Sequence, residues 1–431
     1  MSDSNILSNR NFLLLWTGNA ISNVGLKGVQ IAYPLLALIL TGSPIVSSIV
    51  AFAMILPMVI FEIPAGVVAD HWNHRRVLLA CQRMGLVATL LAAIVIIMEP
   101  PGLPLFLTGA AFAEGTAYVF FNTSELILIR DIVTEDERPG AFAFFDAEQH
   151  IANIIGRSVG AAAVGIARTL PFLANALSYL YCLWTLSKIR DQAPAKSESE
   201  SSNIVRIWDW RHFRVGMQMV WDEPMVRGGT IALAVANAIL QVFVLLITLD
   251  VRASGHSAWA VGVVLGATGL GGLLGAVPAA SLASRISPRI AVTVMVWVWV
   301  FLCMTMVASS NLAALTICWM GVGFVVPLGN IPLTLYRLRA FPDELVGRVF
   351  GATKLIAHSG GAAGALLAGP LLSTLGTATT GWGLVAGMVL LARYARRLPE
   401  RPPAASSHQR SVGPPPATWI TRASRNILEN P

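Results

Sequence analysis

The 431-residue chain is 55% hydrophobic and only 12% charged, which excludes an ordinary water-soluble protein because soluble domains carry about twice that share of charge. Four cysteines without metal or redox spacing exclude a disulfide framework. The net charge of +7 does not indicate a nucleic-acid partner, since the basic residues fall between apolar runs, so we expect a protein embedded in the lipid bilayer.

The apolar runs predict membrane-spanning helices. Residues 28–61 contain no Asp, Glu, Lys or Arg, and a turn signal at residues 41–44 divides them into two spans. The uncharged stretches 290–336 and 355–392 divide in the same way, because a hydrocarbon core takes about 20 helical residues per span. With the single runs, the sequence predicts an all-α integral membrane protein of twelve transmembrane helices. In chain order the spans are 12–40, 45–69, 77–98, 103–130, 141–167, 170–187, 228–250, 259–283, 289–308, 312–336, 347–371 and 378–394.

The basic residues predict the orientation of these spans. Of the 30 Lys and Arg residues, only Arg168 and Arg252 lie on the side opposite the termini, and Lys27, Arg157 and Lys354 lie inside spans. By the positive-inside rule, both termini are expected to be cytoplasmic in a multi-pass protein of the cell (inner) membrane. No cleaved signal peptide is expected.

Composition predicts two pseudo-symmetric halves. A charged, Ser-rich segment separates the sixth and seventh spans, and a Pro-rich segment follows the last span. The predicted parts are an N-terminal six-helix half at 1–187, a cytoplasmic linker at 188–227, a C-terminal six-helix half at 228–397 and a disordered cytoplasmic tail at 398–431.

A glycine pattern supports the internal repeat. The fifth and eleventh spans carry glycines at the same spacing of four and then five residues. Parallel repeats of this kind place a substrate site at their interface near the bilayer midplane. The two sets are Gly156, Gly160 and Gly165, and Gly360, Gly364 and Gly369.

The loop after the second span carries a family signature. Gly66, Asp70 and Arg75 match the Gly, Asp and Arg positions of a motif of the major facilitator superfamily, and Arg76 lies one place beyond. Together with twelve spans and a central linker, the loop resembles that superfamily. The resemblance implies a latch on the cytoplasmic side, in which Asp70 meets a helix N-terminus and the Arg pair binds carboxylates or lipid phosphate. The alternative is that the Arg pair only fixes topology.

Within the superfamily, the segments 9–16 and 130–138 and the Gly-rich fifth span are similar to small-molecule exporters of the enterobactin-exporter and macrolide-efflux type. The resemblance implies a drug/proton antiporter that exports a small amphipathic molecule in exchange for protons. Two positions depart from such antiporters: Ala161 replaces a Pro in the fifth span, and Ala111 is followed by Glu114 where many carry an Arg in the fourth.

Ionisable residues inside the spans supply candidates for proton coupling. A charge at mid-bilayer costs at least about 2.5 kcal/mol, so each needs a partner or a wet cavity. Glu114 is expected to exchange the proton, with Lys27 or Arg157 tuning it, or else Glu114 and Arg157 form a purely structural ion pair. His358 is a further candidate carrier, although a lone His on a helix is more often only hydrogen-bonded.

Uncharged polar residues supply candidates for the substrate cavity. Those of the first span recur every three or four residues and therefore share one helical face with Lys27. Polar residues of the fourth and seventh spans are expected to face the same cavity. The candidate cavity residues are Asn19, Asn23, Gln30, Tyr118, Asn237 and Gln241.

Other functions find less support in the sequence. The chain has no phosphate-binding loop, serine-nucleophile elbow or zinc-protease motif, so we expect no enzyme, no ATP drive, no cofactor and no metal. The expected partners are a small-molecule substrate, protons and the lipid bilayer, with no nucleic acid, and the expected state is a monomer. Two alternatives stay open: an importer or facilitator of the same fold, and a non-transporting membrane receptor or scaffold.

Overall fold

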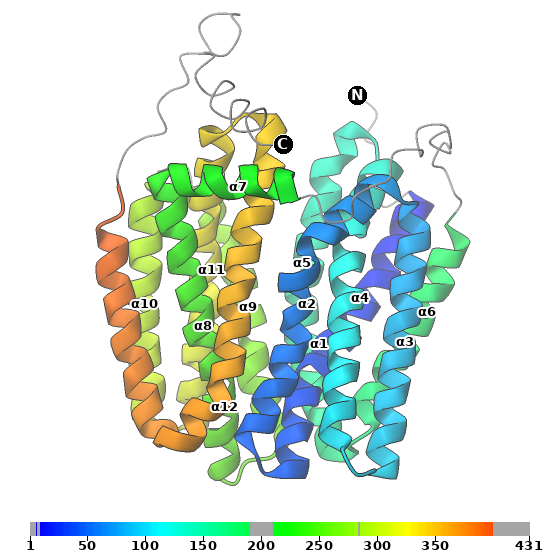
Figure 1. The fold of residues 1–431 in the computed structure, drawn as a ribbon, viewed down its shortest axis with the longest axis vertical. Helices are drawn as coiled ribbons and strands as arrows, with labels where there is room; N and C mark the ends of the chain where they lie inside the picture. Colours follow the sequence, from blue (N-terminus) through cyan, green and yellow to red (C-terminus); the bar gives the residue numbers. More distant parts are fainter. Residues whose placement is uncertain (1–5, 7–8, 190–209, 283–284, 400–431) are drawn as a thin grey trace, which may run out of the picture.

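The computed structural model describes residues 6, 9–189, 210–282 and 285–399, and these form a bundle of long helices (Figure 1). The predicted tail from residue 400 and most of the predicted linker lie outside the described residues. The helices are α1 (Arg10–Thr41), α2 (Pro44–His71), α3 (His74–Met98), α4 (Leu103–Ile132), α5 (Arg138–Ile166), α6 (Leu170–Lys188), α7 (Trp210–Asp222), α8 (Pro224–Ala253), α9 (Ala258–Leu282), α10 (Pro288–Ala308), α11 (Leu312–Ala340) and α12 (Asp343–Arg396), with a short 3-10 helix at Glu135–Glu137.

The twelve predicted spans correspond to α1 to α6, α8 to α11 and the two arms of α12. Nine of the described helices are long and apolar enough to cross a membrane, α12 among them. The α5 and α6 helices are more polar or shorter but run alongside the others (Figure 1). At Gly376 the backbone adopts φ 76° and ψ 169°, a conformation open mainly to glycine, and α12 reverses there. The predicted fold class, an all-α membrane protein of two six-helix halves, is confirmed.

The helix ends lie at residues with the right local chemistry. Asn9 caps α1 by accepting hydrogen bonds from the backbone of Asn11 and Phe12, and Gly42 ends the helix in the left-handed conformation. Ser43 then caps α2, whose first residue is a proline. Such caps satisfy backbone groups that would otherwise be unpaired at the ends of closely spaced helices.

The glycines of the predicted repeat make equivalent contacts in the two halves. In the N-terminal half, a Cβ on Gly160 would overlap the backbone of Gly28 on α1. In the C-terminal half, a Cβ on Gly364 would overlap the backbone of Ala238 on α8. In each half, the missing side chain allows two helix backbones to pack directly against each other.

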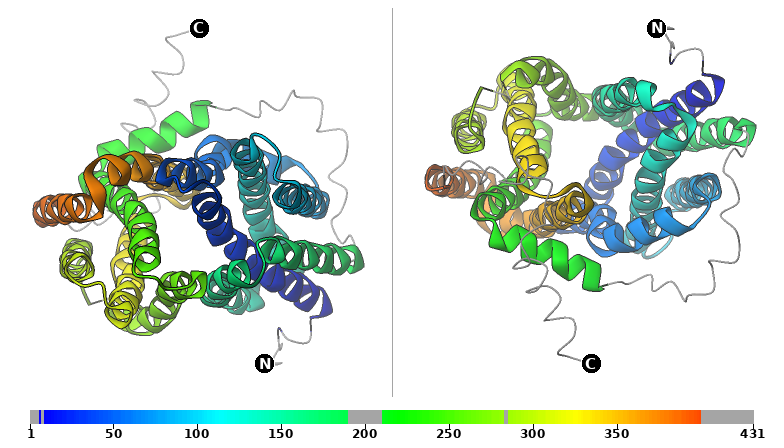
Figure 2. Two further views of the ribbon diagram at one scale, coloured as in Figure 1. Left: turned by 90° about the horizontal axis from the view of Figure 1, so that it is seen from below. Right: turned by 90° about the horizontal axis from the view of Figure 1, so that it is seen from above.

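The two halves meet along two seams, one between α5 and α9 and one between α2 and α12, and lie side by side in Figure 2. In the first seam, a Cβ on Gly262 would lie 2.8 Å from the carbonyl oxygen of Arg157. In the second, a Cβ on Gly369 would lie 2.5 Å from the carbonyl oxygen of Pro44. Gly369 is the last glycine of its repeat, so the repeat packs each half internally and also joins it to the other.

The α7 helix was not predicted, because the sequence interpretation treated 188–227 only as a linker. It lies across the face of the bundle at which α1 begins and α12 ends, which we call the terminal side (Figure 1). A Cβ on Gly216 would overlap the carbonyl of Arg348, so α7 packs directly on the first arm of α12.

Candidate functional site

The polar face of α1 lies inside the N-terminal half. Asn19, Asn23 and Lys27 are all buried, with 1%, 6% and 9% of their surface exposed. Their spacing of four residues places them on one side of the helix, as the sequence predicts. Gln30, the fourth residue of the stripe, is only half-buried.

The two asparagines hold a pair of carboxyl groups. Asn19 Nδ2 donates to Glu125 Oε1 of α4 and, at 3.1 Å, to Glu148 Oε1 of α5. Asn23 Nδ2 donates to the same oxygen of Glu148 at 2.6 Å. Glu125 and Glu148 are 1% and 2% exposed, so both carboxyl groups are removed from bulk water. Sequence analysis gave these two glutamates no role, because they lie toward the ends of their spans.

The α1 cation beside this pair contacts an aromatic ring. Lys27 Nζ lies 5.1 Å from the centre of the Tyr118 ring, within the range of a cation–π contact. The described residues show no ion pair between Lys27 and a carboxylate. The Tyr118 ring of α4 therefore offers the Lys27 ammonium a favourable aromatic face.

Glu114 occupies a separate polar centre, deep in the same half. Its carboxylate accepts hydrogen bonds from Tyr33 Oη at 3.0 Å, Tyr179 Oη at 3.1 Å and Asn175 Nδ2 at 3.2 Å. These donors come from α1 and α6, and Glu114 itself is fully buried. Both carboxylate oxygens thus have partners, which compensates for burying them.

The alternative of a Glu114 to Arg157 ion pair is wrong. Arg157 Nη1 donates to the carbonyl oxygen of Leu265 and to Thr268 Oγ1, both at 3.4 Å and both on α9. Arg157 therefore lies at the seam between the halves, whereas Glu114 faces α1 and α6. The sequence positions of the two residues do not reveal that their partners lie on different helices.

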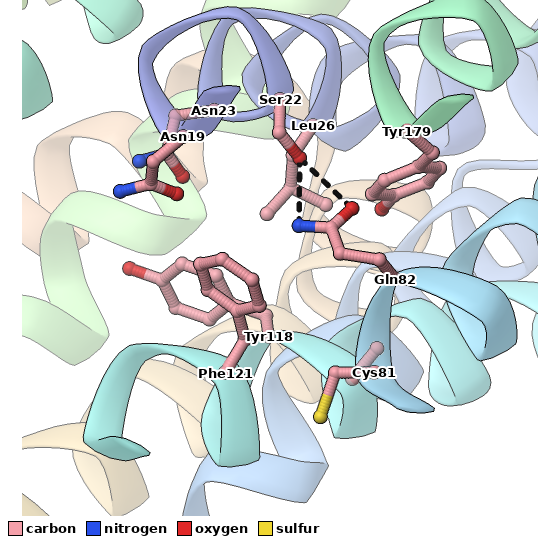
Figure 3. Close-up of a pocket in the computed structure, with 10 residues that line it drawn as sticks. Asn19, Ser22, Asn23, Leu26, Cys81, Gln82, Tyr118, Phe121 and Tyr179 are labelled. Carbon is pink, nitrogen blue, oxygen red and sulfur yellow. Dashed lines mark hydrogen bonds between the residues drawn. The ribbon is translucent and has the colours of Figure 1, made fainter. Parts of the chain in front are cut away.

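A pocket opens beside the α1 stripe (Figure 3). Ser22 and Gln82 exchange hydrogen bonds of 3.2 and 3.1 Å across its wall. Its lining combines aromatic rings with amides, which suits a molecule that has both apolar and polar parts. The lining residues are Asn19, Ser22, Asn23, Leu26, Cys81, Gln82, Ala117, Tyr118, Phe121 and Tyr179.

The candidates of the C-terminal half lie apart from this pocket. Asn237 Nδ2 donates to the carbonyl of Ala357 at 3.3 Å and so ties α8 to α12. Gln241, one turn further along α8, is half-buried. Of the six predicted cavity residues, the pocket brings together Asn19, Asn23 and Tyr118.

His358 lies at the seam between α2 and α12. Its Nδ1 is 3.8 Å from Glu62 Oε2, and the two side chains are 37% and 18% exposed. This is a contact between the halves, remote from the residues that hold Glu114.

Arg75 of the predicted gate motif forms hydrogen bonds within its own half. Arg75 Nε donates to the carbonyl of Leu186 at 2.9 Å, and Nη2 donates to the carbonyl of Ser187 at 3.0 Å. Arg75 thereby caps the C-terminus of α6, where a positive charge is favourable. Gly66 faces open space, and Arg76 is exposed. The side chain of Asp70 lies outside what the structure describes.

Sequence reasoning missed the donors around Glu114. A signal was present: Asn175 and Tyr179 lie four residues apart in the sixth span and so share a helical face. Tyr33 lies beyond the polar stripe of α1 and gave no such signal.

Comparisons with known proteins agree with the fold. The sequence profile described as Major Facilitator Superfamily matches residues 15–365. A multidrug efflux pump named Tap from Mycolicibacterium fortuitum is 27% identical over 388 residues, which cover 86% of this chain and 91% of the pump. Tap from Mycobacterium tuberculosis (strain ATCC 25618 / H37Rv) is 27% identical over 390 residues, covering 86% and 90%.

A solved structure extends the comparison to three dimensions. A point mutant of the nucleoside transporter NupG superposes with a TM-score of 0.63 over 89% of this chain and 98% of its own, at 15% sequence identity. At that identity, the likeness concerns the fold alone.

Proposed function

Because the chain belongs to the Major Facilitator Superfamily, we propose that this multi-pass membrane transporter exports small amphipathic molecules in exchange for protons. The observation that carries the export direction is the similarity to Tap, a multidrug efflux pump, over 86% of the chain. Membership of a transporter family also means that the chain is not an enzyme, as the sequence predicts.

The pocket supports the proposed class of substrate. Tyr118, Phe121 and Tyr179 offer aromatic faces, and the amides of Asn19 and Asn23 offer donors and acceptors at the same pocket. An amphipathic molecule leaves water by burying its apolar part and keeps its polar groups hydrogen-bonded to such amides.

The two seams support alternating access. In this mechanism the halves rock against each other, so contacts between them must form and break while contacts within each half persist. Direct glycine packing within each half makes it a rigid body. Two contacts between the halves would break and re-form in this movement. One is the hydrogen bond from Arg157 of α5 to α9, and the other is the contact of His358 with Glu62.

We further propose that the terminal side is cytoplasmic and that the protein resides in the cell membrane. Most of the basic residues outside the spans lie on that side, as the positive-inside rule requires of cytoplasmic loops.

Transport assays test this function. Cells that express the protein should expel preloaded ethidium and rhodamine 6G faster than cells without it, and a protonophore should abolish the difference. In proteoliposomes, an imposed pH gradient should drive the dyes uphill. Dye uptake into cells would favour an importer instead, and no movement of either dye would contradict the proposal.

A tail deletion separates a transporter from a scaffold. Truncation after residue 398 removes none of the helices that form the pocket. An exporter should keep its dye efflux after this truncation, whereas a receptor or scaffold that works through its tail should lose its activity.

A further inference from the structure

We propose that Glu125 and Glu148 act as one pair that binds a single exchangeable proton, and that this pair, not Glu114, is the proton carrier. The proposal rests on the proton exchange proposed above and names the groups that perform it. It assigns Glu114 a structural role.

The geometry brings the two carboxyl groups to one donor. Asn19 Nδ2 donates to an oxygen of each, so the carboxyl groups of α4 and α5 are gathered by a single amide of α1. Two negatively charged carboxyl groups that contact the same amide repel each other strongly, because little water is present to screen their charges. One proton shared by the pair removes that repulsion, which is why such pairs titrate as a unit.

The cluster also has fewer hydrogen-bond donors than acceptors. Glu125 Oε2, Glu148 Oε2 and Asn19 Oδ1 are all buried and have no hydrogen-bond partner among the residues that the structure describes. Asn19 is 1% exposed and its amide contacts both carboxyl groups, so its unpartnered oxygen lies within the cluster. A buried acceptor without a donor is costly, and a proton on one carboxyl group supplies a donor where only acceptors are present.

No fixed cation neutralises the pair. None of the ion pairs among the described residues includes Glu125 or Glu148, and the nearest cation on α1, Lys27, lies over the Tyr118 ring. Arg157 of α5 donates to α9 instead.

The other ionisable groups facing the pair are few. Tyr118 on α4 and Cys182 on α6 are within electrostatic reach of both carboxyl groups, and Glu62 on α2 is within reach of Tyr118. The α9 helix, packed on α5, has no ionisable residue. In the proposed exchange the proton is taken up from water and returned to water, and the net charge of the two carboxyl groups changes from −2 to −1 and back.

Glu114 differs in each of these respects. It stands alone, and both of its oxygens accept hydrogen bonds, from Tyr33, Asn175 and Tyr179. Protonation would break hydrogen bonds there, whereas at the pair it supplies one that is missing.

The pocket links the pair to substrate. Asn19 and Asn23 both line the pocket and both donate to the carboxyl pair. A cation such as ethidium, bound in the pocket beside these amides, favours the doubly ionised form of the pair, so the bound dye and the bound proton oppose each other. By reciprocity, if substrate binding releases a proton, the affinity for substrate rises as pH rises.

Proton release on dye binding tests the assignment. Ethidium added to purified wild-type protein in weak buffer should release about one proton per bound dye, and its affinity should rise with pH. Glu125→Gln and Glu148→Gln should each abolish the release and flatten the pH dependence. In proteoliposomes, uphill efflux should fall by about a hundredfold in either variant, and the double variant should be no worse than the single ones.

Two controls keep the result interpretable. Exchange of ethidium across the membrane without a pH gradient should persist in the Gln variants, which shows that they fold and bind dye. Glu99→Gln, which changes an exposed carboxyl paired with Arg168, should leave proton release unchanged.

The outcomes separate this inference from the proposed function. Retained proton release in both pair variants, with loss in Glu114→Gln, would overturn the assignment while leaving proton exchange intact. If the wild-type protein moves dye but releases no proton and ignores the pH gradient, proton exchange itself is wrong, and the pair carries none.

Discussion

The interior of the N-terminal half buries three carboxyl groups, a lysine and several amides, whereas the buried polar residues described in the C-terminal half are four threonines and Arg337. The backbones of the halves nevertheless pack alike, with direct glycine contacts between α5 and α1 and between α12 and α8. A duplicated fold thus retains its packing, while the buried carboxyl groups among the described residues lie in one copy alone. Movement requires both halves, but the proposed proton coupling requires only the first.

The largest expected effect tests whether the packing really is shared. Gly160→Leu and Gly364→Leu should each destabilise the protein by about 3 kcal/mol or more, because the new side chains overlap the backbones of α1 and α8. The loss of stability is measured as a fall in the temperature at which half of the protein is no longer monodisperse. Gly361→Leu is the matched control, since a Cβ there meets nothing within 4 Å. A strong effect in only one half would mean that the two halves do not depend on the same packing.

A smaller effect is expected at the polar centre of the N-terminal half. Glu114→Gln should lower the free energy of unfolding by about 1 to 3 kcal/mol, because the amide brings a donor toward Tyr33, Asn175 and Tyr179, which are donors already. Chemical denaturation measures the loss, and the pH dependence of dye transport should be unchanged. A variant of normal stability would contradict the structural role.

A still smaller loss of stability is expected in the gate motif. Arg75→Ala should cost about 1 kcal/mol, because the C-terminal carbonyls of α6 lose a charged donor. Arg76→Ala, at the exposed neighbouring position, should be close to neutral in the same thermal assay. Equal losses in the two variants would indicate that general loop charge matters more than the cap.

The smallest effect is expected in the interior of the C-terminal half. Thr230→Val removes a 3.3 Å hydrogen bond from Arg337 Nη2 and should cost about 0.5 to 1 kcal/mol. Dye transport and its pH dependence should stay at wild-type values. A loss of proton coupling here would break the proposed division between the two halves.

The sequence predicts the fold well because the bilayer constrains it strongly. Apolar runs of fixed length and turn residues such as Gly42 and Ser43 locate the spans, and these residues do end α1 and begin α2. The α7 helix is missed because its polar, aromatic sequence has neither the length nor the apolarity of a span.

The site is predicted only in part. The four-residue spacing of Asn19, Asn23 and Lys27 identifies a polar face from sequence alone, since it depends on one helix. Which groups that face meets depends on how helices rotate against each other, so the contact with Glu148 and the separation of Glu114 from Arg157 were not predicted.

The polar character of α5 has a consequence for biosynthesis. This helix carries Arg157 inside its span and Glu148 closer to one end, and a charged residue at the centre of a span adds about 2.5 to 3.5 kcal/mol to the free energy of insertion. The hydrogen-bond partners of Glu148, which are Asn19 and Asn23, lie on α1, and α1 emerges from the ribosome well before α5. Because α1 precedes α5 in the chain, we expect α5 to enter the lipid most readily when α1 is already there to donate hydrogen bonds to Glu148.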